Sequence, residues 1–91
     1  MNLLDKFKKF DAENPHVYKL FEKFTLQAID KGHRRLSAWL IVNRIRWETM
    51  VMTTGIDFKI SNDFIALYSR KFMEKNPQYD GFFVTKEMKR T

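Results

Sequence analysis

The stretch from Asn14 to Gly32 constrains the fold most, because it carries a start signal, one apolar face and a stop signal for a helix. The Asn14 side chain can accept hydrogen bonds from the free N–H groups of a first helical turn, and Pro15 loses nothing at the first helical position. Gly32 tolerates the left-handed conformation that closes a helix. We therefore predict a helix over residues 15–31. Its apolar face comprises Val17, Leu20, Phe21, Phe24, Ala28 and Ile29.

One further helix is expected before this one and one after it. Apolar residues recur three and four positions apart over residues 2–11, which predicts a short amphipathic N-terminal helix. Ser37 can cap another helix, and Thr53-Thr54-Gly55 breaks it. Its apolar arc is wide, so we expect it to be the central helix, buried on more than one side. Its end stays open, since residues 49–53 alternate enough to form a strand instead.

The C-terminal third predicts one more helix and two short strands. Ser61 or Asn62 can cap a helix that runs to about Lys75, where Asn76-Pro77 stops it. Residues 56–60 alternate apolar and polar side chains, and residues 82–85 follow an Asp-Gly turn, so both segments indicate strands. The expected fold is one small domain, residues 1–91. Its class is mainly α (α+β), with three to four helices, a minor two-stranded β-ribbon packed on them, and a basic tail over residues 86–91.

Composition excludes several classes of protein. The chain has no cysteine, so disulfides and thiolate metal sites are ruled out and an intracellular location is favoured. The first ten residues contain no continuous apolar run, and no stretch approaches the roughly 20 apolar residues of a membrane span. We therefore expect a cytoplasmic protein with neither a signal peptide nor a membrane anchor.

Catalytic and metal-binding patterns are also missing from the sequence. Neither His16 nor His33 has a carboxylate or a second histidine at metal-ligand spacing. Ser37 and Ser61 are explained as helix caps, and there is no GxSxG, HExxH or glycine-rich phosphate loop. We expect neither an enzyme nor a metal or cofactor site.

Positive charge is concentrated in the middle of the chain. The net charge is +6, and residues 31–46 hold five lysines and arginines with no acidic residue. The acidic and basic residues of residues 1–30 balance. A focused block of one sign is typical of a nucleic-acid footprint, although a solvated basic face gives the same pattern.

The candidate nucleic-acid contacts centre on the loop that follows Gly32. Its cations lie beside the start of a helix, where free N–H groups favour an anion such as a DNA phosphate. A helix-turn-helix outline around Gly32 is weaker than a plain helical hairpin, because charged residues flank the glycine. Arg44 can pair with Glu48 along the helix, which leaves Arg46 free. The predicted DNA-binding residues are Lys31, His33, Arg34, Arg35, Arg46, Arg70 and Lys71.

A protein-binding module is the alternative function. Tyr18, Trp39, Tyr79 and Phe82 could form an exposed aromatic patch of the kind that interfaces use. Trp47 follows Leu40 by seven residues, which is a core register, so we expect it to be buried. A homodimer or larger homo-oligomer held by the N-terminal helix is the third hypothesis.

Four phrases together resemble a set of small proteins encoded by bacteriophages and prophages. They are "ENPHVYKLF", "GHRRLSAWLIVNRIRWE", "FKISNDFIALYSRKFM" and "NPQYDGFF", and the resemblance covers roughly residues 10–85. It implies a phage or prophage gene that acts in a bacterial cytoplasm. The resemblance carries over no functional residues, because no function is established for the set. The leading hypothesis is then a small phage regulatory or accessory protein that binds nucleic acid, DNA more than RNA, at its phosphates. The alternative is a protein-binding module that modulates a host or phage enzyme.

Overall fold

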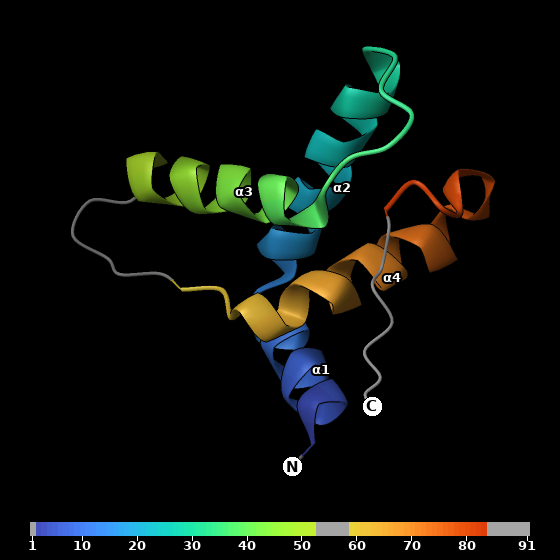
Figure 1. Ribbon diagram of the computed structural model, residues 1–91. Coiled ribbons are helices and arrows are strands. Elements are labelled where there is room, and N and C mark those ends of the chain that lie inside the picture. Colours follow the sequence, from blue (N-terminus) through green and yellow to red (C-terminus); the bar gives the residue numbers. More distant parts are fainter. Residues whose placement is uncertain (1, 53–58, 84–91) are drawn as a thin grey trace.

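The computed structural model describes residues 2–52 and 59–83, which form a helical fold (Figure 1). The helices are α1 (Leu3–Glu13), α2 (Pro15–Asp30), α3 (Ala38–Met52) and α4 (Ile65–Lys75). Two 3₁₀ turns, η1 (Asn62–Phe64) and η2 (Pro77–Tyr79), flank α4. The mainly α class is confirmed, and the four predicted helices match within one or two residues. Residues 49–52 are helical, which excludes a strand there.

The predicted β-ribbon is not present in the described part of the chain. Residues 59–60 are irregular, and residues 82–83 form a bend after the turn at Gly81. Both Phe82 and Phe83 are buried, so they do not alternate as a half-exposed strand would. The rest of the two predicted strands, residues 56–58 and 84–85, and the basic tail over residues 86–91 lie outside the described residues.

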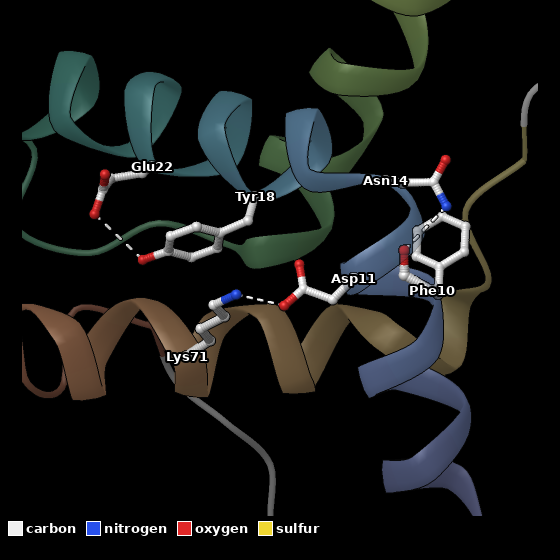
Figure 2. Close-up of polar contacts among 6 residues, drawn as sticks. All are labelled: Phe10, Asp11, Asn14, Tyr18, Glu22 and Lys71. Carbon is white, nitrogen blue, oxygen red and sulfur yellow. Dashed lines mark hydrogen bonds and ion pairs between the residues drawn. The ribbon is translucent and has the colours of Figure 1, made fainter.

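Asn14 closes α1 instead of capping α2, so its predicted role was wrong. Its side-chain Nδ2 donates to the Phe10 carbonyl oxygen at 3.0 Å, and its backbone N–H donates to the same oxygen at 2.8 Å (Figure 2). No side-chain hydrogen bond from Asn14 caps α2, which begins directly at Pro15. Asn14 thus satisfies the Phe10 carbonyl in the last turn of the preceding helix, and the proline starts the next one.

Gly32 ends α2 as predicted. Its φ is +96°, and the residue closes a Schellman motif in which the His33 N–H donates to Ala28 O at 3.1 Å and the Gly32 N–H donates to Ile29 O at 2.9 Å. The Ser37 side chain then accepts a hydrogen bond from the Trp39 N–H, which confirms Ser37 as the cap of α3. Ser61 caps η1 in the same way, through the Asp63 N–H.

An aromatic core joins α1, α2 and α4. Tyr68 of α4 is fully buried and meets Phe7 of α1 edge to face, with ring centroids 4.8 Å apart. It also stacks on Phe21 of α2 at 5.7 Å, and Phe72 packs against Phe83 at 5.8 Å. Such pairs stabilise a core by about 0.5–1.5 kcal/mol beyond the area that they bury. The N-terminal helix is thus held by its own chain.

The Tyr68 hydroxyl is buried, and no described residue accepts a hydrogen bond from it. We expect Tyr68→Phe to leave the free energy of unfolding unchanged or to raise it by up to about 1 kcal/mol, because no hydrogen bond is lost and an unsatisfied polar atom is removed. Tyr18→Phe is the matched control, since Tyr18 donates to Glu22 at 3.2 Å and should lose about 1 kcal/mol. Urea denaturation followed by circular dichroism measures both, and a clear loss for Tyr68→Phe would contradict the assignment.

Helix α3 contributes only one side to the core, so its prediction as a central helix was wrong. Ile41, Val42 and Ile45 are buried against α2 and α4. In Figure 1 the helix lies across α2, and its C-terminal half extends past that crossing. No described element covers the opposite side. The wide apolar arc therefore consists of two faces, of which the fold buries one.

Candidate functional site

Five large apolar side chains of α3 are exposed on the side that faces away from the core. Their exposed fractions lie between 53% and 62%. At about 100° per residue they fall within an arc of roughly 120°, opposite the buried residues of the same helix. We call them the α3 face: Trp39, Leu40, Trp47, Met50 and Val51. Exposed apolar side chains that gather on one face, unlike single scattered ones, often mark an interaction site.

The α3 face has the spacing of a helix–helix seam. Residues 40, 43, 47 and 50 are separated by three, four and three positions, which is the repeat of packed helices. The polar member of this series is Asn43, and its side chain is engaged within the same helix. Its Nδ2 donates to Trp39 O at 2.8 Å, and its Oδ1 accepts from Arg46 at 3.3 Å. A partner helix can therefore cover this series of residues and the Asn43 amide keeps its hydrogen bonds.

A groove between α2 and α3 continues the α3 face toward the core. Its volume is about 690 Å³, and Leu40 and Asn43 belong to both the groove and the seam. The two features thus form one continuous surface. The apolar residues that line the groove are Phe24, Ala28, Leu36, Leu40 and Ile41.

Cations outnumber acids along this groove. Lys31 and Arg44 line it, against Asp30 on the acidic side. The Arg44 guanidinium lies 4.7 Å from the Phe24 ring centroid, and it pairs with Glu48 at 3.5 Å as predicted. This exposed pair adds little stability, but the ring contact fixes Arg44 at the groove wall.

The basic loop, which we define as Lys31, His33, Arg34 and Arg35, is exposed throughout. It belongs to a connection over residues 31–37, which is longer than the three- or four-residue turn of a helix-turn-helix. The helix-turn-helix interpretation is therefore excluded, and α2 and α3 form a plain helical hairpin. His33 and Arg34 also line a hollow of about 300 Å³ with Tyr79 and Asp80.

Arg46 is held inside the fold, so the expectation that it is free was wrong. Its guanidinium donates to the Ile60 carbonyl oxygen at 2.5 Å and to Asn62 Oδ1 at 2.8 Å, in addition to its contact with Asn43. These bonds attach α3 to the segment that leads into α4. Arg46 is thus part of the scaffold.

Lys71 also has partners within the fold, where α4 packs against α1 and α2. Its Nζ donates to Asp11 and lies 4.4 Å from the Tyr18 ring centroid (Figure 2). Tyr18 and Asn76 both donate to Glu22 at 3.2 Å. Burial, followed by the negative charge of Glu22, raises the pKa of Tyr18 above its ordinary value. These contacts between α4 and the first two helices therefore form a structural network.

The Asp11–Lys71 pair should contribute measurably to stability, since its side chains are only 16% and 28% exposed. We expect Asp11→Asn and Lys71→Met each to lower the free energy of unfolding by about 1–2 kcal/mol, because each leaves a partly buried group without its partner. The double variant should lose less than the sum of the two. A double-mutant cycle by urea denaturation measures this coupling, and strictly additive losses would contradict the pair.

Arg70 is exposed on α4, but acidic residues separate it from the basic loop. It lines a hollow with Glu74 and Asp80, and Asp80 also lines the hollow beside Arg34. Of the seven predicted DNA-binding residues, the structure brings together the four of the basic loop.

The predicted aromatic patch does not form. Tyr18 and Phe82 are buried, and Tyr79 is partly buried. Of the four residues predicted for the patch, Trp39 is the exposed one. Trp47, predicted to be buried, is 59% exposed. Sequence reasoning therefore missed most of the α3 face. The spacing does separate two series, residues 40, 43, 47 and 50 and residues 41, 42 and 45, but it does not say which of them the fold buries.

The described residues contain no cluster of three histidines or carboxylates able to bind a metal. None of the helices in the same ranges has the length and hydropathy needed to cross a membrane. Comparison of the chain with family models, with curated protein sequences and with solved structures found no match.

Proposed function

We propose that this protein is a small protein-binding module that docks a partner on the α3 face and the adjoining groove. The observation that carries the proposal is the exposure of Trp39, Leu40, Trp47, Met50 and Val51 on one side of one helix. Among the described residues, Leu4 of α1 and Leu26 of α2 are the other exposed large apolar side chains, and they lie singly on their helices, whereas five such side chains gather on α3. Tryptophan is also the residue type most enriched among side chains that dominate binding energy.

A matched pair of leucines provides the test. Leu40 on the α3 face is 53% exposed and Leu4 on α1 is 47% exposed, so glutamate at either position should be tolerated by the fold. We expect the wild-type protein and Leu4→Glu to retain the same bacterial proteins from a nuclease-treated lysate, and Leu40→Glu to lose them. Retention that is equal in all three, or absent in all three, would contradict the proposal.

Nucleic-acid binding in a bacterial cytoplasm, as in a phage regulatory or accessory protein, is the second candidate. The basic loop favours it, because no ion pair joins Lys31, Arg34 or Arg35 to another described residue. The basic loop would bind phosphates, and the affinity would fall steeply as the salt concentration rises. Gel-shift titrations at two salt concentrations, with Arg34→Ala/Arg35→Ala as the variant, test it. This candidate ranks second because Arg46 and Lys71 are engaged and because it leaves the α3 face without a role.

A further inference from the structure

We infer that the occupant of the α3 face is an amphipathic helix of a partner protein, with acidic residues flanking its apolar stripe. This inference rests on the proposed function and specifies the class of partner. It is supported by the form of the surface and by the placement of charge around it.

The form of the surface matches helix-in-groove recognition. In that mode, an amphipathic helix inserts anchors spaced three and four residues apart into an apolar groove. Residues 40, 43, 47 and 50 present the complementary seam, and α3 is about 22 Å long, enough for roughly two heptads. Strand addition, the other common mode, needs an exposed sheet edge, and the described residues contain no strand.

The positive charge beside the α3 face and the groove favours an acidic partner. Arg44 and Arg46 are about 200° apart on α3 and lie on opposite sides of its exposed face. Arg44 pairs with Glu48, and Arg46 keeps its positive charge because its acceptors on Ile60 and Asn62 are neutral. Lys31 extends the positive edge along the groove, while Asp30 and Glu48 are the acids beside it. Acidic side chains on both flanks of a docking helix would face these cations.

The same charge disfavours a second copy as the occupant. Each chain carries a net charge of +6, and residues 31–46 contain no acid. Pairing of two α3 faces would bring like-charged flanks together, and like-charge juxtaposition at an interface is unfavourable. A partner helix with glutamate or aspartate flanks avoids this cost and gains attraction.

Three synthetic amphipathic peptides test the inference. They share one leucine stripe and differ only in carrying glutamate, glutamine or lysine at the flanking positions. Both tryptophans of the chain lie on the α3 face, so intrinsic emission reports its occupancy directly. We expect a blue shift and binding at least about tenfold tighter for the glutamate peptide than for the lysine peptide at low salt. The difference should shrink as salt is raised.

Variants separate the apolar contribution from the charge contribution. Leu40→Glu should abolish binding of the glutamate peptide, and Leu4→Glu should preserve it. Lys31→Glu should reduce the preference for the glutamate peptide, while Lys23→Glu, an exposed change on α2 away from the groove, should not. All four variants should keep the helical circular dichroism of the wild type.

The possible failures are distinguishable. Equal binding of the three peptides, or preference for the lysine peptide, would overturn the acidic partner and leave docking on the α3 face intact. Absence of peptide binding, with lysate capture that still depends on Leu40, would overturn a helical occupant alone. A doubling of solution mass with a blue shift in the absence of peptide would assign the face to a second copy. Absence of both peptide binding and lysate capture would end the proposed function as well.

Discussion

Phe72→Ala should lower the free energy of unfolding by about 3–5 kcal/mol, whereas Trp47→Ala should lower it by less than about 1 kcal/mol. Phe72 is fully buried and its ring contacts those of Phe21, Phe83 and Tyr79. Its removal leaves a cavity that a close-packed core cannot refill. Trp47 is mostly exposed, so its removal takes away little buried area.

Urea denaturation followed by circular dichroism measures both losses. Small domains are stable by only about 5–15 kcal/mol, so Phe72→Ala should leave a visibly destabilised protein. Similar losses for the two variants would mean that Trp47 belongs to the core and that the α3 face does not exist in solution. A near-wild-type Trp47→Ala that loses its lysate partners would instead assign that tryptophan to binding.

Arg46→Ala should lower the free energy of unfolding by about 1.5–3 kcal/mol, because hydrogen bonds from a charged group to Ile60 and Asn62 are lost. Arg34→Ala should change it by less than about 0.5 kcal/mol, since Arg34 is exposed on the basic loop. The two variants remove the same charge from the same basic block. The comparison therefore separates a scaffold arginine from a surface one.

Arg46→Lys is the conservative control for this prediction. Lysine keeps the charge but lacks the planar fork that reaches two acceptors at once, so stability should be only partly restored. Chemical denaturation and gel-shift titration of the same samples are both needed. Unchanged stability in Arg46→Ala, with weakened DNA binding, would support the sequence-based assignment of Arg46 to nucleic acid and contradict the structural one.

Helix boundaries were predictable because local steric rules set them. Gly32 adopts a positive φ that other residues rarely take, and Pro15 and Pro77 each start a new helical segment. The capping role of Asn14 failed for a local reason too. An asparagine between two helices can serve either one, and only the geometry of the junction decides between them.

The exposed face of α3 was not predictable from periodicity alone. Helical spacing identifies apolar residues, but it does not say whether the fold or a partner covers them. Ile45 and Trp47 are both apolar and two positions apart, yet one is buried and the other exposed. The first two residues of the strand predicted over residues 82–85 differ for a similar reason, because Phe82 and Phe83 are both buried in a bend.

Interactions between distant residues account for the contacts of Arg46 and Lys71 that helical spacing did not predict. Arg44 and Glu48 are four residues apart, so their pairing followed from helix geometry. Asp11 and Lys71 are 60 residues apart, and Arg46 reaches acceptors 14 and 16 residues away. Such contacts depend on tertiary structure, which the sequence pattern does not reveal.

Collisional quenching of intrinsic tryptophan fluorescence tests the central claim most directly. Trp39 and Trp47 are the two tryptophans of the chain, and both are more than half exposed on the α3 face. The dilute free protein should show the long-wavelength emission of hydrated indole, strongly quenched by a soluble quencher, with both Trp39→Phe and Trp47→Phe behaving alike. Short-wavelength emission protected from the quencher in the dilute monomer would contradict the exposed α3 face.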